Sequence, residues 1–213
     1  MPTSNAYKIR TKQSDLFLRV SKGHFATGHS HINYYIDVTT QKTRLSEASS
    51  VAKKLVAYYS YSTIIDTILC LDGTEVIGAC LARELTQSNF VNLNAHQTIY
   101  VVTPERTTGS QLIFRDNTAP MIAGKNVLIL AASVTTGYTA QAATDAIKYY
   151  GGTVAGISSI FTMLDTCAGH KVTSVFDLKD LGDYASYPSH ECPLCKQGVK
   201  IDAFVNSFGY SKL

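Results

Sequence analysis

The feature that most constrains the fold is an apolar run that passes directly into a loop of small, hydroxyl-bearing residues. Val127–Ala132 is apolar at every position, as expected of a strand covered on both faces in a parallel sheet. Ser133–Gly137 supplies hydroxyls and a glycine, so backbone N–H groups can approach a ligand closely. A helical pattern begins at Thr139 and ends at Gly151 and Gly152. This strand–loop–helix unit predicts an anion site, because the unpaired N–H groups and the dipole of a helix N-terminus favour phosphate.

Other apolar runs alternate with helical patterns, which is typical of the α/β class. We expect helices over Leu45–Tyr61 and Val76–Leu85 and strands over Tyr34–Val38, Ile64–Leu71, Gln97–Val102 and Thr153–Phe161. We also expect a short helix within Tyr7–Val20, an edge strand over Val172–Phe176 and a short helix over Leu178–Leu181. The pattern predicts an open parallel sheet flanked by helices, with ligands at the carboxyl ends of the strands.

Length and composition favour one domain, with a core at about residues 45–162 and outer segments at about 1–44 and 163–213. The net charge of +3 is mild, and no stretch gathers Lys and Arg on one face, so we expect no nucleic-acid partner. No run approaches the ~18 apolar residues of a membrane span, and residues 1–14 do not resemble a signal peptide. Five scattered cysteines favour a reducing cytoplasmic location.

The run Ala131–Thr139 carries a resemblance to a known family. Thr135, Thr136 and Gly137 match the end of the ribose-phosphate loop of the type I phosphoribosyltransferases, which has an apolar strand, two acidic residues, two further residues and Thr-Thr-Gly. The resemblance extends in order of elements over most of the chain and points to the orotate phosphoribosyltransferases of pyrimidine nucleotide metabolism. It implies the phosphoribosyltransferase fold, with a small hood built from the N- and C-terminal segments.

The resemblance also implies a ligand and a set of residues that hold it. The ligand would be phosphoribosyl diphosphate (PRPP), ribose 5-phosphate or a nucleotide, with Mg²⁺ as cofactor if the protein is catalytically active. Enzymes of this family are commonly homodimers, so we expect a homodimer. The implied phosphate-binding residues are Ser133, Thr135, Thr136, Gly137, Tyr138 and Thr139.

The chain departs from the family at the acidic pair, where it has Ala131 and Ala132. Alanine has no side-chain acceptor for the ribose hydroxyls. One hypothesis is therefore that the protein binds the ligand but transfers the phosphoribosyl group to orotate weakly or not at all. An active transferase for a nucleobase other than orotate is the alternative, with Asp72, Glu75 or Asp116 supplying the carboxylate. An engineered inactivation is a further hypothesis, although the absent orotate-type Lys and Arg residues argue against it.

Two other stretches resemble functional segments of the family. Asp72, Gly73, Thr74 and Glu75 occupy the position of its pyrophosphate loop, although an ordinary strand-to-helix turn explains them equally well. Possible base or hood contacts are Phe25, His31, Tyr34, Tyr35 and Arg106. The simpler alternatives are a surface hairpin with exposed histidines for residues 23–37, and a solvated loop over Thr103–Ser110 for Arg106.

The C-terminal segment contains Cys192-Pro-Leu-Cys195, which also occurs in orotate-type sequences. A Cys-x-x-Cys pair is half of a tetrahedral zinc site, and Cys167 with His170 could supply the other half. The spacing is loose, so reduced cysteines in a packed C-terminal arm are the favoured interpretation. A thioredoxin-type redox role is disfavoured, because the pair does not open a helix after a strand.

Overall fold

A computed structural model describes residues 6–10, 16–87, 92–95, 98–109 and 111–213 of the chain. The chain divides into two compact units. We call Met1–Thr40 with Phe176–Leu213 the terminal unit, and Gln41–Val175 the central unit. The core expected at residues 45–162 lies inside the central unit, whereas the organisation as one domain stays a prediction.

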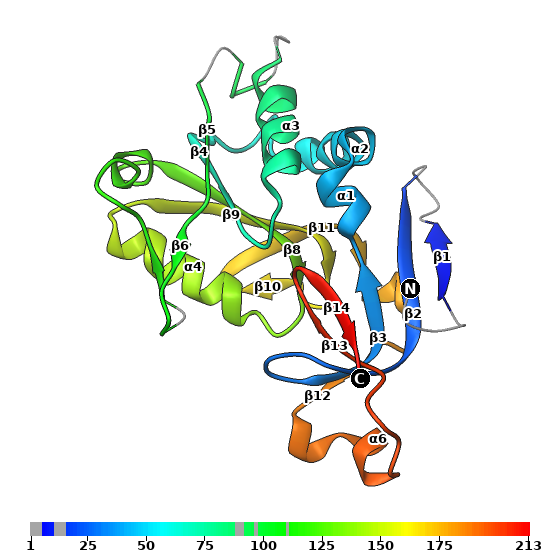
Figure 1. Ribbon diagram of the computed structural model, residues 1–213. Coiled ribbons are helices and arrows are strands. Elements are labelled where there is room, and N and C mark those ends of the chain that lie inside the picture. The colour runs from blue at the N-terminus through cyan, green and yellow to red at the C-terminus, as the bar shows by residue number, and fades with distance from the viewer. Residues whose placement is uncertain (1–5, 11–15, 88–91, 96–97, 110) are drawn as a thin grey trace. The chain divides into compact units, whose positions relative to one another are not determined.

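The central unit is built on a mixed sheet in the order β10-β11-β9-β8-β4-β5 (Figure 1). Its strands are β4 (Thr67–Cys70), β5 (Tyr100–Val102), β8 (Asn126–Val134), β9 (Thr153–Thr162), β10 (Thr166–Cys167) and β11 (His170–Asp177), which runs on into the terminal unit. Helical segments are α2 (Leu45–Leu55), η1 (Val56–Tyr58), α3 (Glu75–Thr86), η2 (Ala119–Met121) and α4 (Tyr138–Tyr149), and α1 (Thr39–Thr43) lies at the unit boundary. A separate hairpin pairs β6 (Glu105–Arg106) with β7 (Leu112–Ile113).

The neighbouring strands β5, β4, β8 and β9 are all parallel, which confirms the predicted open parallel α/β sheet. The expected strand and helix boundaries agree with the structure to within a few residues, and Gln97, the first residue of one expected strand, lies outside the described residues. The expected edge strand at residues 172–176 is longer, because β11 begins at His170 and pairs with both β9 and β10.

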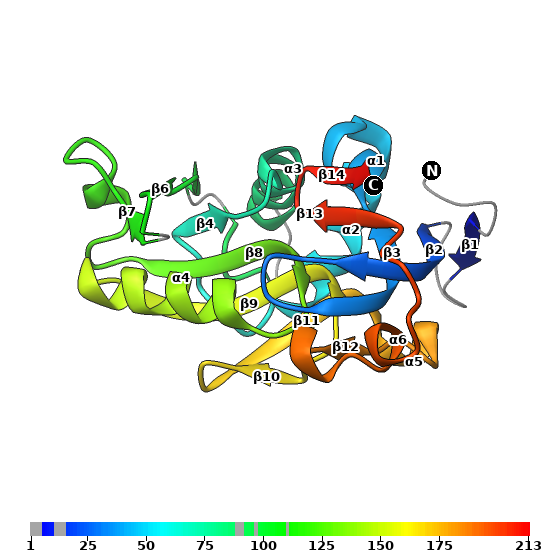
Figure 2. The same cartoon turned by 60° about the horizontal axis from the view of Figure 1, so that its bottom comes forward.

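Helices cover opposite faces of this sheet because side chains alternate along each strand. Leu69 and Ile129 pack in one apolar cluster with Ala143 of α4, and Figure 2 shows α4 lying along β8 and β9. Gly78 of α3 faces Cys70 on the other side, where an added Cβ would stand only 2.4 Å from the Cys70 sulfur. Among the described residues, no helix has the length and apolar character needed to cross a membrane.

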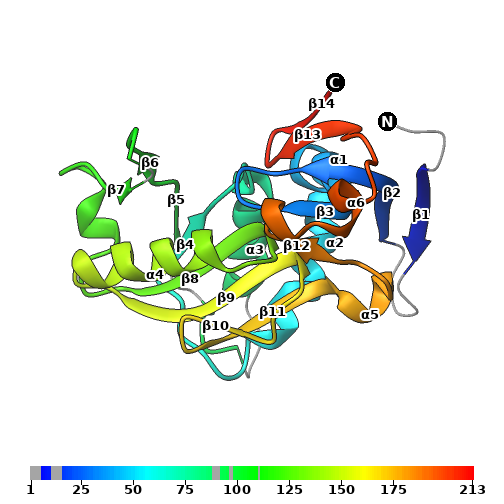
Figure 3. The same ribbon diagram turned by 90° about the horizontal axis from the view of Figure 1, so that it is seen from below.

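A buried hydroxyl cluster joins the segment after α2 to the sheet. The Tyr59 hydroxyl lies 2.7 Å from the Ser158 hydroxyl of β9 and 2.8 Å from the Thr173 hydroxyl of β11. Gly156 makes room for the Tyr59 ring, since a Cβ there would approach the ring to 3.1 Å. Figure 3 shows β11 beside β9, as this bonding requires.

The terminal unit is a second sheet, in the order β12-β3-β2-β13-β14, with β1 paired to β2. Its strands are β1 (Ala6–Arg10), β2 (Phe17–Ala26), β3 (His31–Asp37), β12 (Ser186–Tyr187), β13 (Ala203–Asn206) and β14 (Gly209–Lys212). Short helical segments are α5 (Leu178–Leu181), η3 (Ser189–Glu191) and α6 (Pro193–Lys196).

The short helix expected within Tyr7–Val20 is wrong, because the described part of this segment forms β1 and the start of β2. Residues 11–15 of that segment lie outside the described residues. The two strands pair antiparallel, with Tyr7 opposite Val20 and Ile9 opposite Leu18. Both Leu18 and Val20 are fully buried, so the period of the apolar positions here is that of a strand.

Candidate functional site

The predicted anion loop has the predicted local structure. Strand β8 ends at Val134 and helix α4 begins at Tyr138. Gly137 occupies the N-cap position with φ +81° and contributes no side-chain cap to the helix. The first backbone N–H groups of α4 therefore have to find partners outside the helix, and an anion is one such partner.

The side chains of the loop differ in exposure. Ser133, Thr136 and Tyr138 are exposed, and Thr135 and Thr139 are half-buried. These five side chains all carry hydroxyl groups, and they run from the end of β8 into the first turn of α4. The structure therefore brings together the six residues predicted to bind phosphate, and their role as ligands of a phosphate stays a prediction.

The backbone of Gly137 is left-handed, and its Cα is also closely surrounded by other side chains. A Cβ at this position would lie 2.9 Å from the Cys167 sulfur and 3.3 Å from a methyl group of Leu164. The Cys167 thiol donates to the Gly137 carbonyl at 3.5 Å. The loop conformation thus depends on having no side chain here, both because φ is positive and because the space is filled.

Ala131 and Ala132, at the position of the family's acidic pair, are both buried at the end of β8. Ala131 belongs to the apolar cluster beneath α4. The backbone N–H of Ala132 donates to the side chain of Asp72, which follows the neighbouring strand β4. A carboxylate therefore reaches the end of β8 from the adjacent loop.

Asp72 sits in an unusual environment for an acidic side chain. Its backbone is left-handed, with φ +57°, and the following Gly73 has φ +77°. Burial raises the pKa of Asp72, while the positive charges of Lys42 and Arg106 and the Ala132 N–H oppose that rise. The group is held in the loop by these contacts although its charge is poorly solvated, which is common at functional sites.

Lys42 is a site residue that the sequence did not suggest. Its ammonium group donates to the Asp72 carbonyl at 2.7 Å, and only 8% of the residue is exposed. Lys42 belongs to α1 and precedes Asp72 by thirty positions in the sequence. No local motif marks it, so the structure is needed to find a positive charge at this loop.

The rest of the predicted pyrophosphate loop is anchored to the sheet. The fully buried Thr74 hydroxyl lies 2.8 Å from the Leu71 carbonyl and 3.0 Å from the Leu130 carbonyl. Glu75 begins α3 and accepts a hydrogen bond from Thr103. These contacts fix the path of the loop, and its binding of pyrophosphate stays a prediction.

Arg106 is exposed on β6, and its charge acts on Asp72. Its sequence neighbour Glu105 is engaged by Arg115, whose guanidinium group donates to that carboxylate at 2.6 and 2.7 Å. Arg106 therefore lies within electrostatic range of the candidate site, and its contact with a base stays a prediction. Ser110, the last residue of the expected loop, is outside the described residues.

The aromatic candidates in the terminal unit are parts of its core. Phe25 is fully buried and its ring centre lies 6.0 Å from that of Tyr35, which is also buried. The buried Tyr34 donates its hydroxyl to Asp183 at 2.6 Å. Burial gives each of these residues a structural explanation, and a role in contacting a base stays a prediction.

The zinc ligands proposed from the sequence need a correction. Cys167 and His170 lie opposite each other in the β10–β11 pair of the central unit, and the Cys167 thiol is engaged by Gly137. The side chains that gather with Cys192 and Cys195 are instead His24 and His31. The expectation of a hairpin with exposed histidines is also wrong for His24, which is 1% exposed.

Comparison with known proteins provides a family context for this geometry. No known family model matches the chain. The chain is 29% identical to an orotate phosphoribosyltransferase of Chlorobium phaeobacteroides over 186 residues, which are 85% of this chain and 86% of the relative. An orotate phosphoribosyltransferase of Chlorobaculum parvum is 28% identical over 184 residues, with the same coverage of both chains.

Among solved structures, the Mycobacterium tuberculosis orotate phosphoribosyltransferase in complex with Fe(III) dicitrate superposes with a TM-score of 0.52. Its sequence is 18% identical, and the match covers 78% of this chain and 93% of that one. At this identity the likeness is one of fold. It agrees with the open parallel sheet and the strand–loop–helix unit described above.

Proposed function

We propose that this chain, which has the type I phosphoribosyltransferase fold, is an orotate phosphoribosyltransferase-like protein whose central unit binds a ribose 5-phosphate or a nucleotide phosphate. The phosphate lies on the loop Ser133–Thr139, and transfer of the phosphoribosyl group to orotate is weak or absent. The observation that carries the proposal is Gly137, whose left-handed backbone turns β8 into α4 and leaves the helix N-terminus without a side-chain cap.

The phosphate is held by backbone N–H groups and hydroxyls. The N–H groups at the start of α4 and the helix dipole favour the phosphate dianion. Thr135, Thr136 and Thr139 add hydroxyl donors around it. Because this loop has its phosphate-binding elements in place, binding of the 5′-phosphate does not depend on the missing acidic pair.

The ribose is held less completely than in an enzyme with two acidic residues at the end of β8. Hydrogen bonds to charged groups contribute roughly 1.5–3 kcal/mol each, so the loss of two would cost about 3–6 kcal/mol, or about 10²–10⁴-fold in affinity or rate. Asp72, which accepts from the Ala132 N–H, is the side chain placed to recover part of this loss. We assign the Asp72 carboxylate the role of accepting hydrogen bonds from the ribose hydroxyls.

A second function is supported by the same carboxylate. If Asp72 replaces the acidic pair fully, the chain is an active phosphoribosyltransferase that takes PRPP and a nucleobase other than orotate. The charges of Lys42 and Arg106 near Asp72 suit a diphosphate leaving group. Asp72 and Glu75 are oxygen donors of the kind Mg²⁺ prefers, so they fit that ion, and Mg²⁺ when bound would neutralise the diphosphate charge.

The chemistry required of the chain in that case is mainly positioning. The base nitrogen attacks C1 of the ribose as the bond to diphosphate breaks, so positive charge develops on the sugar ring. The Asp72 carboxylate would stabilise that charge and orient the ring, and Lys42 would face the departing diphosphate. A cytoplasmic location and a homodimeric assembly belong to the same proposal.

Titration calorimetry with ribose 5-phosphate tests the phosphate site, with Gly137→Ala as the variant and Gly151→Ala as its matched control. Both glycines have positive φ, at +81° and +77°, and they lie at opposite ends of α4. An added Cβ collides with Cys167 at Gly137, whereas a Cβ added at Gly151 would meet nothing within 4 Å.

We expect Gly137→Ala to lose measurable binding and Gly151→Ala to bind as the unaltered protein does. Both should lose comparable stability from the left-handed backbone, about 1–2 kcal/mol each, with a further loss at Gly137 from the collision. Equal binding by both variants would show that the phosphate does not sit on this loop. Adding PRPP and a panel of bases to the unaltered protein, with pyrophosphate release as the readout, then separates binding from transfer.

A further inference from the structure

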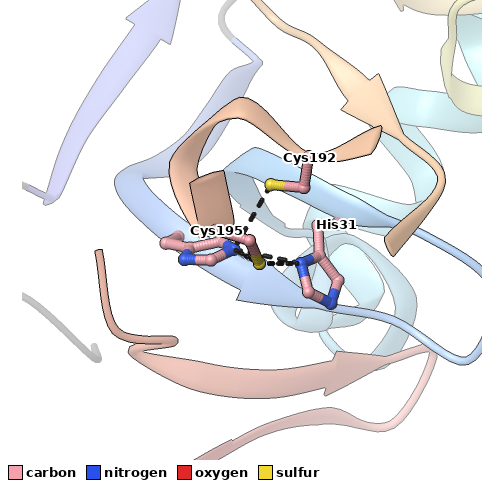
Figure 4. A group of neighbouring side chains, drawn as sticks. His31, Cys192 and Cys195 are labelled. Carbon is pink, nitrogen blue, oxygen red and sulfur yellow. Dashed lines mark hydrogen bonds between the residues drawn. The ribbon is translucent and has the colours of Figure 1, made fainter. Parts of the chain in front are cut away.

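We propose that the terminal unit holds a structural zinc ion, coordinated by His24, His31, Cys192 and Cys195. The ligand atoms of these side chains all lie within 4.8 Å of one another. Figure 4 shows Cys192, Cys195 and His31 pointing toward one another, from α6 and its N-cap and from the first residue of β3. The proposal is independent of the phosphate site.

Four of the six distances between the ligand atoms are close to those of a tetrahedral zinc site, and the other two are no longer than 4.8 Å. With Zn–N bonds of about 2.0 Å and Zn–S bonds of about 2.3 Å, neighbouring ligand atoms of a tetrahedron lie about 3.3–3.8 Å apart. His24 Nε2 lies 3.1 Å from His31 Nδ1 and 3.5 Å from the Cys192 sulfur. The Cys195 sulfur lies 3.7 Å from His24 Nε2 and 3.2 Å from His31 Nδ1.

Hydrogen bonding alone does not explain this convergence. His24 Nδ1 lies 2.9 Å from the Val199 carbonyl, which can only accept, so Nδ1 carries the proton and Nε2 is left with one lone pair. Three groups approach that lone pair: two sulfurs and the Nδ1 of His31. A metal ion shared by all four ligands accounts for the arrangement, and the bond to Val199 is the outer contact that orients a zinc-bound histidine.

The local sequence explains how His24 comes to point inward. The register of β2 against β3 shifts between Lys22 and Phe25, so His24 lies in a bulge, and bulges re-aim side chains. Both His24 and the following Phe25 are buried, although successive side chains of a regular strand point to opposite faces. Gly23 lets Asp202 approach closely, and the Asp202 carboxylate accepts from the His24 N–H at 2.8 Å.

The Cys-x-x-Cys segment is arranged as a ligand pair. Cys192 is 1% exposed and precedes α6, a one-turn helix that brings Cys195 to the same side. Cys195 is exposed, so an ion can reach the cluster from solvent. All five cysteines are free thiols, and two thiolates with two neutral imidazoles form a Cys₂His₂ donor set typical of structural zinc.

Such a site would join segments that are far apart in the sequence. His24 and Cys192 are separated by 168 positions, and the ion would tie the β2–β3 hairpin to the C-terminal segment. The short helix α6 has four residues and none of them is buried, so it has little apolar packing of its own. We infer that the ion holds this segment in place.

Metal analysis tests the site on the full chain, purified with reductant and without chelator. We expect about one zinc per chain, and Cys195→Ser and His31→Ala to lose it. His190→Ala is the matched control, because this histidine lies two residues before Cys192 and its side chain is 78% exposed beside Glu191. The control should retain the zinc of the unaltered protein.

Cobalt uptake by chelator-treated unaltered protein tests the site without relying on variants that fail to fold. Addition of Co²⁺ should produce the intense thiolate-to-cobalt absorption of a tetrahedral site, and Cys195→Ser should weaken it. Hydrogen exchange should increase over residues 190–200 after zinc removal and stay unchanged in β8 and α4. Less than about 0.2 equivalents of zinc together with no cobalt band would overturn the proposal, since structural zinc binds too tightly to be washed away.

Discussion

Replacing Asp72 with asparagine separates the ribose-binding role of this residue from any role in shaping the loop. Asparagine has nearly the same shape and tolerates the left-handed backbone that Asp72 adopts at φ +57°. The change removes a charged acceptor, and hydrogen bonds to charged groups contribute roughly 1.5–3 kcal/mol. We therefore expect ribose 5-phosphate to bind about 10- to 150-fold more weakly, whereas inorganic phosphate, which has no ribose, should bind as before.

The same substitution should not destabilise the fold at neutral pH. Burial raises the pKa of Asp72, so the folded state holds the proton more tightly than the unfolded state does. The free energy of unfolding therefore falls as pH rises from the ordinary aspartate value toward the raised pKa, and above that window the charged group is a penalty. Asp72→Asn lacks this penalty and should unfold at the same or a higher temperature than the unaltered protein at pH 7.

Two assays are needed, calorimetric titration with each ligand and thermal unfolding followed by circular dichroism. The gap in unfolding temperature should shrink as the pH is lowered below about 3, under the ordinary aspartate pKa, where the aspartate is largely protonated in both states. Equal affinity of both proteins for ribose 5-phosphate would refute the ribose assignment. Parallel losses for ribose 5-phosphate and phosphate, with a lower unfolding temperature, would show that Asp72 acts by holding the loop.

Two further substitutions test contacts around the site and beneath it. Lys42→Gln removes the positive charge beside the Asp72 loop, and it should weaken binding of a diphosphate ligand more than of a monophosphate, measured by calorimetry. Tyr59→Phe removes one hydroxyl from a buried cluster, so Ser158 and Thr173 each lose one hydrogen-bond partner, although their own hydroxyls still lie 2.8 Å apart. It should lower the free energy of unfolding in urea by about 1–3 kcal/mol, and Tyr58→Phe, at a half-exposed position, should change it little.

The central unit was predictable because its signals are local. The apolar run of β8, the hydroxyl-rich loop and the apolar stripe of α4 follow one another without interruption, and each agrees with the next. The same holds for one helix of the terminal unit, because the predicted Leu178–Leu181 helix matches α5, whose start is set by a capping box at Asp177. Where neighbouring residues decide the structure, periodicity and capping suffice to find it.

The terminal unit was less predictable because its sheet joins distant segments. Strand β2 pairs with β13 through Phe25 and Ala203, which are far apart in the chain. Pairing of this kind leaves no local pattern. The helix expected before residue 20 is wrong for a different reason, because the alternating buried residues Leu18 and Val20 are a local strand signal with a short period. The metal ligands show the same limit: Cys192 and Cys195 form a visible motif, whereas the bulge that turns His24 inward is a property of the folded hairpin.

The ribose role that we propose for Asp72 would place the chemistry of the acidic pair on the neighbouring strand. The parallel strands β4 and β8 end at the same edge of the sheet, with Cys70 opposite Leu130. A side chain just beyond β4 therefore faces the same ligand as one at the end of β8. Asp72 follows β4 and accepts from the backbone of Ala132, so the charge missing from one strand is present on its neighbour. A motif read along one strand reports Ala131 and Ala132 as a loss, whereas on our proposal a ligand at this edge would meet the Asp72 carboxylate beside the same backbone.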